Sequence, residues 1–283
     1  MSLSRLFLTF ALFIFVVLPV STAKASDSIY DIDYDENRPP ELYELEFIPK
    51  LNVIIDPETS LPFDIRFEAM REAALSYGAR GGLAFRTYQI RMELDEKGDY
   101  LDKVFDFRQL LIPAPSGLLI EPPIVSENVN AMIIESGGRE AAVADRVYNI
   151  SRNAQITSTA RSWRNYLERQ WGDVKPPPDI LRPNDEEERE RWIEWVNEGW
   201  EIGIDQANDI FEQDLNQLQA HYMGMVRYRM LLAQGMVSPP YALQVDRGIT
   251  GGGNNMRVGD RAIEITGMPE LMPGTEKWQP ASR

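Results

Sequence analysis

The chain has no cysteine among its 283 residues, and this absence excludes several kinds of chemistry. No disulfide can hold the fold together and no thiolate can bind a metal or act as a nucleophile, so stability has to come from an ordinary hydrophobic core. The cysteine to which a bacterial lipoprotein attaches its lipid is missing as well. We therefore expect the exported chain to carry no lipid of its own.

Histidine is nearly absent too, because His221 is the single one. A zinc or copper site needs further histidine or cysteine ligands, and a serine triad would have to use His221 without a Gly-x-Ser-x-Gly motif. We interpret His221 as a structural residue on a helix. The glycines at 251–253 lack the lysine and the following helix of a phosphate loop, and they indicate a hairpin turn. The sequence predicts no catalytic residue, no metal site and no cofactor.

Basic charge is scarce: 29 Lys and Arg stand against 44 Asp and Glu, a net charge of −15. Removal of residues 1–25 takes away Arg5 and Lys24 and brings the charge to −17. Such a chain repels phosphate backbones, so we expect no direct binding of nucleic acid. Two suitably separated carboxylates are enough for a glycosidase, but 44 acids give accidental pairs. A carboxylate-dependent hydrolase therefore stays only the third alternative.

Long apolar runs are missing except at the N-terminus, where residues 6–20 follow Arg5 and precede Ala23-Lys24-Ala25. A basic residue, an apolar core and a small-x-small pattern are typical of a secretory signal peptide, here cleaved after Ala25. The apolar core is shorter than the roughly 20 residues that span a bilayer, although a retained N-terminal anchor is the alternative. The sequence thus predicts export to the periplasm or cell surface.

The next segment, residues 26–60, is acidic and contains Pro39 and Pro40. It lacks the apolar surface that would offset the entropy of ordering, so we predict a disordered arm. Its tyrosines and leucines leave open that the arm orders against a partner. At the other end, residues 269–283 are predicted to form a flexible tail.

Residues 61–268 predict a globular domain of the α+β class. Apolar residues with a helical period indicate long helices at about 62–95 and 185–235. Short alternating runs between 112 and 160 and between 243 and 266 indicate antiparallel strands that pack with these helices. Asn184 or Asp185 is suited to cap the second helix and Gly235 to end it. The proline-rich residues 175–183 mark a possible subdivision.

Glycines interrupt both predicted helices. Gly78, Gly81 and Gly82 each cost about 1 kcal/mol relative to alanine in a helix, and their alanine neighbours favour close packing against another backbone. The second helix would be about 75 Å long if unbroken, which is longer than a domain of this size is wide. We therefore predict a kink in it, near one of its own glycines, namely Gly199, Gly203 or Gly224.

The second helix also carries an apolar residue at every seventh position. This stripe favours a face towards the core over an intermolecular coiled coil, because polar residues interrupt the neighbouring seam. The stripe consists of Ile204, Phe211, Leu218, Met225 and Leu232.

Six residues are candidates for contact with a partner protein. Trp192 and Trp195 share a face at the start of the second helix, and tryptophan is enriched in binding hot spots, although core packing is the alternative. The others follow directly on the end of that helix, where loops often carry function: Met236, Pro239, Pro240 and Tyr241.

Several segments together resemble the DotC family, over roughly residues 66–268. The longest are REAALSYGARGGLA at 71–84, TARSWRNYL at 159–167, EGWEIGIDQAN at 198–208 and GMVSPPY at 235–241. Shorter ones are MGM at 223–225, YR at 228–229, LLA at 231–233, GITG at 248–251 and DR at 260–261. None of these motifs is catalytic.

The resemblance implies a structural subunit of a type IVB (Dot/Icm-like) secretion or conjugation machine. It implies a place in a ring-shaped core complex at the outer membrane, with DotD-like and DotH-like proteins as partners. Members of that family are typically lipoproteins, so a chain without the lipobox cysteine is expected to reach the outer membrane through partners. The runner-up is a free periplasmic binding module for a sugar or lipid.

Overall fold

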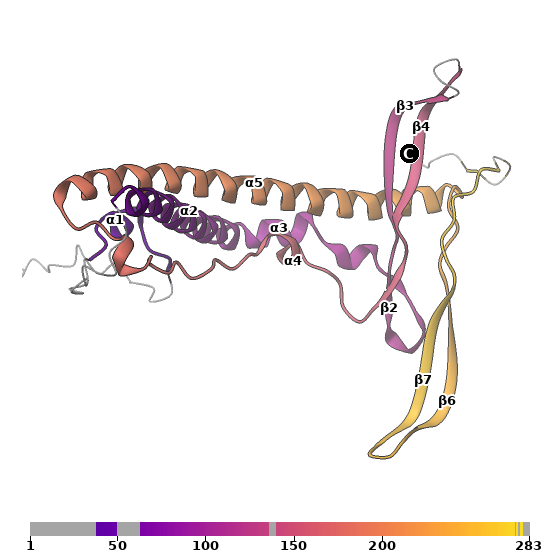
Figure 1. Cartoon of the computed structure of the whole chain (residues 1–283). Coiled ribbons are helices and arrows are strands. Elements are labelled where there is room, and N and C mark those ends of the chain that lie inside the picture. Colours follow the sequence, from indigo (N-terminus) through magenta and orange to yellow (C-terminus); the bar gives the residue numbers. More distant parts are fainter. Residues whose placement is uncertain (1–37, 50–62, 136–139, 275, 277, 280–283) are drawn as a thin grey trace, which may run out of the picture. The chain divides into compact units, whose positions relative to one another are not determined.

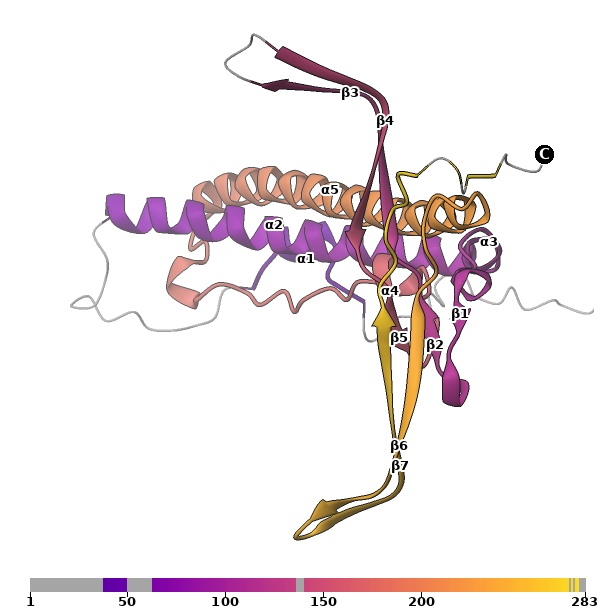
Figure 2. The same ribbon diagram turned by 90° about the vertical axis from the view of Figure 1, so that its right-hand side faces the viewer.

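Two long helices form the centre of the fold, and they lie side by side (Figure 1, Figure 2). The helices are α2 (Phe63–Glu96) and α5 (Glu186–Ala233). Within the part of the chain that the structure describes, three small antiparallel sheets accompany them. The α+β class predicted from the sequence is confirmed.

The computed structural model describes residues 38–49, 63–135, 140–274, 276, 278 and 279. The predicted signal peptide and residues 26–37 and 50–60 of the predicted arm lie outside these ranges. Residues Pro39–Arg283 form one unit by their contacts. None of the described helices has the length and apolar character that crossing a bilayer requires.

The helices α2 and α5 run in the same direction. Near their N-terminal ends Arg66 forms an ion pair with Glu188, and further along Arg86 Nε donates to Asn208 Oδ1 at 2.8 Å. In each pair the two residues are 122 positions apart in the sequence. Equal steps along α2 and α5 therefore keep the helices in contact, as in a parallel pair. A parallel pair needs a long return connection, and residues 97–185 provide it.

Glycines bring the two backbones into direct contact, as their flanking alanines predict. A Cβ added to Gly78 or Gly82 would collide with the backbone of α5, and one added to Gly199 or Gly203 would collide with the backbone of α2. Gly81 instead accommodates the side chains of Leu45 and Trp200. Only residues without a side chain allow this approach.

The predicted kink in the second helix is wrong, because α5 is one unbroken helix of 48 residues. Its glycines serve as contact points instead of hinges. Gly199 and Gly203 face α2, and Gly224 faces Ile124 and Val125 of strand β3. The ends agree with the sequence: the Asp185 side chain accepts from the Glu188 amide at 2.8 Å, and Gly235 adopts a φ of 71° just beyond the helix.

The heptad stripe of α5 packs inside the chain. Leu218 and Met225 are fully buried, and Phe211 lies against the same cluster. This core also contains the fully buried Trp163, whose Nε1 donates to Asp102 Oδ1 at 2.7 Å.

The return connection contains most of the short elements. Its helices are α3 (Gly98–Val104) and α4 (Arg164–Leu167), with short 3-10 turns η1 (Phe107–Leu110), η2 (Pro115–Gly117) and η4 (Asp179–Leu181). Strands β1 (Ile112–Pro113), β2 (Leu119–Glu121) and β5 (Gln155–Thr157) form a three-stranded sheet in the order β1-β2-β5.

Two β-ribbons complete the described structure. Strands β3 (Ile124–Glu135) and β4 (Glu140–Arg152) form one, and β6 (Tyr241–Gly252) and β7 (Asn255–Gly267) form the other. Each is an antiparallel two-stranded sheet without a third strand among the described residues. The glycines at 251–253 lie at the turn of the second ribbon, as predicted.

Two segments predicted to be poorly ordered contain ordered parts. Residues 38–49 include the short helix α1 (Leu42–Glu46), and Leu45 and Ile48 are buried against α2 and α5. In the C-terminal segment, Leu271 bridges to Val237, and the Met272 amide donates to the Met236 carbonyl at 2.8 Å. Composition averaged over each segment does not predict these ordered parts, because a few well-spaced apolar residues are enough to dock a short segment.

Candidate interaction surfaces

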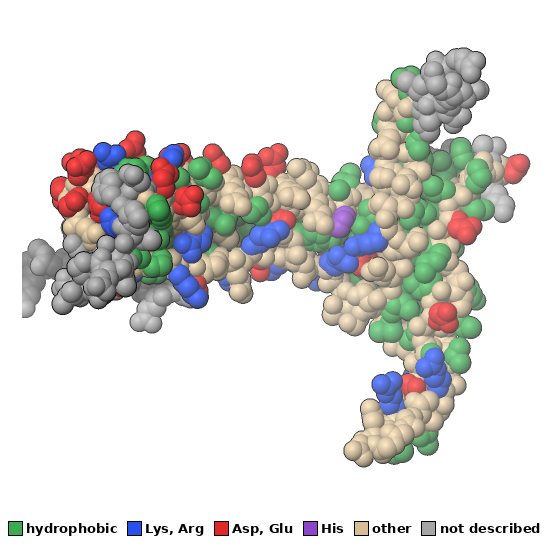
Figure 3. All heavy atoms as spheres, in the orientation of Figure 1, with side chains coloured by type: hydrophobic (Ala, Val, Ile, Leu, Met, Phe, Trp, Pro, Cys, Tyr) green, Lys and Arg blue, Asp and Glu red, His purple; other side chains and the backbone are tan. Residues whose placement is uncertain are grey.

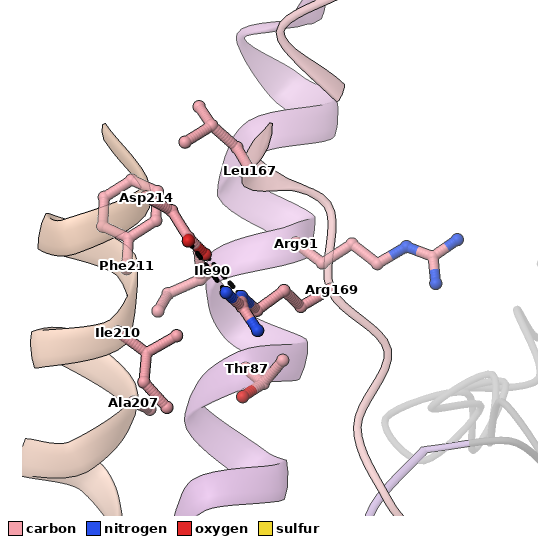
Figure 4. Close-up of a pocket in the computed structure, with 9 residues that line it drawn as sticks. All are labelled: Thr87, Ile90, Arg91, Leu167, Arg169, Ala207, Ile210, Phe211 and Asp214. Atoms are coloured by element: carbon pink, nitrogen blue, oxygen red, sulfur yellow. Dashed lines mark hydrogen bonds and ion pairs between the residues drawn. The ribbon is translucent and has the colours of Figure 1, made fainter. Parts of the chain in front are cut away.

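A small cavity within the helical layer is a structural ion-pair site. It lies between α2, α5 and the segment after α4, and Figure 4 shows Arg169 and Asp214 pointing towards each other within it. Arg169 donates two hydrogen bonds to the Asp214 carboxylate, and the one from Nη2 to Oδ1 is 2.8 Å long. The hydrogen bond to this carboxylate raises the pKa of the guanidinium. The cavity holds about 20 Å³, which is room for about one water molecule and for no organic ligand.

A second polar cluster joins the three-stranded sheet to α4 and α5. The buried Glu121 carboxylate binds Arg152 and, at 2.9 Å, the Nε of Arg161. Beside it the Tyr166 hydroxyl lies 3.0 Å from His221 Nδ1. Burial is the main cause that lowers the pKa of His221, and the positive charges of Arg152 and Arg161 lower it further. The ring therefore stays neutral. This network connects four elements, which fits the structural role predicted for His221.

The described residues do not gather into a metal site. No group of three or more His, Asp or Glu side chains among them is placed to hold an ion. The prediction that the chain is not an enzyme stays a prediction.

An apolar groove lies between β4, the C-terminal end of α5 and the C-terminal segment. Its volume is about 620 Å³. Leu231 of α5 and Met236 of the following loop form one wall of the groove. The opposite wall includes Tyr148 of β4 and, from the C-terminal segment, Met272 and Trp278. The Trp278 Nε1 donates to the Met272 carbonyl at 2.9 Å, which orients the indole. The groove also borders Asp145 and Arg146, and Met236 in its wall is one of the predicted partner residues.

Both β-ribbons expose apolar side chains to solvent. Met132 lies directly opposite Val143 in the first ribbon, and Ile249 lies opposite Val258 in the second. Their exposed fractions range from 60% to 71%. A two-stranded ribbon is only marginally stable in water without a packed face. The ribbons therefore carry unpaired strand edges and apolar pairs that are suited to contact with other proteins.

The structure separates the six predicted partner residues. Trp192 and Trp195 belong to the core around α1, where Trp192 Nε1 donates to the Leu45 carbonyl at 3.1 Å. Both indole rings therefore occupy the core, which is the alternative that the sequence left open for them. Met236 lines the groove, while Pro239 and the 68% exposed Tyr241 lie at the surface where β6 begins.

The sixth predicted residue, Pro240, is partly buried beside Tyr241. The sequence did not predict that Met132 and Val143 form an exposed pair, because each residue is typical of an ordinary strand. The only available signal was the lack of charge at 128–134 and 141–144.

These features define a class of protein: a parallel helical pair that carries two exposed β-ribbons and an apolar groove. Within this class the chain belongs to the T4SS TraI family, described as type IV secretory system, conjugal DNA-protein transfer, whose profile matches residues 64–280. That range spans α2 to the C-terminal segment and so covers nearly all of the described fold. A comparison with curated proteins gave no significant match.

Proposed function

We propose that the chain is a non-enzymatic structural subunit of a type IVB secretion or conjugative transfer machine. The observation that carries this proposal is the family match over residues 64–280. The finer assignment to DotC rests on the sequence motifs at 71–84 and 198–208. These two motifs form the two sides of the glycine contact between α2 and α5. The resemblance thus falls on residues that determine the fold.

The proposed place of the subunit is the periplasmic side of the outer membrane, after cleavage of a signal peptide. Without a cysteine the chain has no site for an N-terminal lipid, so a lipidated partner similar to DotD would hold it there, together with a DotH-like protein. The apolar groove beside Met236 is the proposed contact for these partners. It is open to solvent and lined by flexible methionines, and methionine adapts well to a partner's shape.

The test is a mild-detergent pull-down of the tagged chain from its own envelope, followed by mass spectrometry. We expect stoichiometric recovery of DotD-like and DotH-like proteins in the outer-membrane fraction. Met236→Glu, which places a charge in the groove, should reduce this recovery about tenfold or more. Met223→Glu is the matched control, because Met223 is exposed on α5 outside the groove and should recover partners as the wild type does.

A chain that stays monomeric and brings no envelope protein with it would contradict the proposal. The groove then favours the second candidate, a free periplasmic binding module. Its volume lies within the range of about 300–1,000 Å³ that is typical of small-ligand sites. A screen of sugars and lipids by tryptophan fluorescence would follow, since Trp278 lines the groove.

A further inference from the structure

A second hollow lies in the helical layer, adjacent to the small ion-pair cavity, and its volume is about 270 Å³. One wall is a face of α2, the other is the segment after α4 at residues 169–173, and α5 contributes Ile210. The hollow shares no lining residue with the apolar groove. It is smaller than the range of about 300–1,000 Å³ that is typical of small-ligand sites, so it suits a compact ligand.

Trp171 is the aromatic part of this hollow, and α2 holds its ring in place. The rings of Tyr88 and Trp171 meet edge to face, with their centroids 5.2 Å apart. The Arg91 guanidinium lies 5.6 Å from the centre of the indole. Among the described residues, none accepts a hydrogen bond from the indole Nε1. Trp171 therefore has a fixed orientation and keeps one donor for a ligand.

Four further polar side chains line the hollow. Arg80 donates its Nε to a carbonyl of its own helix at 3.1 Å, but it has no ion-pair partner among the described residues. Within the same described ranges, the side chains of Gln170 and Asp173 make no hydrogen bond or ion pair. The Thr87 hydroxyl donates to the carbonyl four residues before it at 2.6 Å, so its oxygen can still accept. The set thus offers both donors and acceptors.

Charge inside the hollow is balanced. Arg169 points towards Asp214 and is neutralised by it (Figure 4). Arg91 is engaged with the indole and is not a lining residue. Arg80 and Asp173 then leave one positive and one negative group for a ligand. On the face that Figure 3 shows, the acidic side chains gather instead over the N-terminal half of α5. A balanced set of donors and acceptors fits a neutral polar ligand better than an ion.

Apolar side chains complete the lining, namely those of Leu83, Ala84 and Ile210. A pyranose ring has the matching chemistry, because its C–H groups form an apolar face and its hydroxyls both donate and accept. The C–H groups carry slight positive charge, which the negative face of an indole attracts. Guanidinium, amide and carboxylate groups can each bind two neighbouring hydroxyls. A fatty chain in the same place would leave these polar groups unpaired, which costs binding free energy.

We infer that the hollow beside Trp171 binds one neutral pyranose unit of a glycan. The ring packs on Trp171, and its hydroxyls bind Arg80 and Asp173. The inference goes beyond the proposed function and does not rest on it, because the groove assigned to partner proteins has other lining residues. A subunit placed in the cell envelope would gain an attachment to carbohydrate in addition to its protein partners.

Saturation-transfer difference NMR on the purified full chain tests this site. The probes are methyl β-glucoside and methyl N-acetyl-β-glucosaminide. We expect saturation of the ring C–H protons of at least one of them, with a dissociation constant of about 1 mM, because so small a ligand buries little surface. Arg80→Ala and Asp173→Ala should each weaken binding about tenfold, since each removes a hydrogen bond to a charged group.

Both of these positions are exposed and without an ion-pair partner among the described residues, so the variants should fold. Arg71→Ala and Asp95→Ala are the matched controls, because both residues are exposed on α2 outside the hollow. They should bind the glycoside as the wild type does. Equal weakening in a control and in its matched hollow variant would overturn the inference.

The aromatic ring is tested separately. Trp171→Ala should abolish the signal, whereas Trp171→Phe keeps an aromatic face and should retain part of it. Met236→Glu, which disturbs the groove, should bind the glycoside normally, so this measurement and the envelope pull-down can fail independently. Binding that survives Trp171→Ala would place the sugar elsewhere and overturn the inference.

Two further results would also overturn it. One is the absence of saturation for both glycosides at about ten times the expected dissociation constant. The other is saturation of acetate, used as an anionic probe, without saturation of either glycoside. That result would assign the hollow to an anion bound by Arg80.

Discussion

At the scale of single residues, glycines determine how closely α2 and α5 approach. Gly203 lies against Ala79, and an added Cβ would overlap the Ala79 carbonyl oxygen and lie 2.7 Å from the Leu83 nitrogen. Neither group can move without shifting the backbone of α2. The preference of helices for alanine over glycine, about 1 kcal/mol, is smaller than the cost of such overpacking.

We therefore expect Gly203→Ala to lower the free energy of unfolding by about 1–3 kcal/mol, as measured by urea denaturation. Gly172→Ala is the control, because nothing lies within 4 Å of a Cβ at that position. Its effect should stay within about 0.5 kcal/mol. An unchanged or raised stability of Gly203→Ala would show that the backbones are not in contact.

His221 makes stability depend on pH. Burial is the main cause that lowers its pKa in the folded chain from 6.5, and Arg152 and Arg161 add to this effect while Glu121 opposes it. The unfolded chain therefore takes up the proton first as the pH falls. The stabilising contribution is complete above about pH 6.5 and is lost as the pH falls towards the lower folded pKa.

The comparison of wild type with His221→Asn isolates this contribution, since asparagine keeps a polar atom near the Tyr166 hydroxyl. Between about pH 7.5 and 5.5 the free energy of unfolding of the wild type should fall more steeply than that of the variant. Urea titrations at several pH values measure both slopes. Equal slopes would mean that His221 is not held neutral.

At the scale of elements, Leu45 is the fully buried residue by which α1 docks on the helical pair. Leu45 is fully buried, and its side chain fills the space beside Gly81. Its carbonyl accepts a hydrogen bond from Trp192 Nε1. Five helical residues cannot form a stable helix in water alone. The order of α1 therefore depends on this docking.

Leu45→Ala should release α1 and cost about 2–5 kcal/mol of stability. Hydrogen exchange is expected to rise across residues 38–49 while α2 and α5 stay protected. Tyr43→Ala on the exposed side of the same helix serves as the control and should leave exchange unchanged. Equal protection of residues 38–49 in wild type and Leu45→Ala would contradict the role of this anchor.

At the scale of the whole molecule, the chain is strongly acidic. Copies with a net charge of −15 repel each other at long range, but at physiological salt this repulsion is screened beyond about 8 Å. Any attraction between copies therefore has to come from groups in close contact.

Export is the whole-molecule prediction that can be measured most directly. The mature chain isolated from the envelope should begin at Ser26, as intact mass or N-terminal sequencing would show. Ala25→Arg removes the small residue required at the cleavage site and should cause the precursor to accumulate. Ser28→Arg, beyond that site, is the control. A wild-type chain that keeps residues 1–25 would support the retained anchor instead.

The sequence by itself determined the features that depend on neighbours along the chain. The extents of α2 and α5, the cap at Asp185, the stop at Gly235 and the turn at 251–253 follow from local pattern and backbone preference. Glycines flanked by alanines also predicted close packing, since their cost in a helix needs a compensating contact. The signal peptide remains a prediction from sequence.

Only the tertiary structure decided what depends on distant residues. The parallel direction of α2 and α5 requires a return of residues 97–185 that no local pattern specifies. The unbroken course of α5 follows from α2 and β3 packing along its glycines. The docking of α1 placed Trp192 and Trp195 in the core, and the docking of Leu271 and Met272 formed the groove. Local sequence sets the elements, whereas the burial of side chains far apart in the chain sets which faces remain for partners.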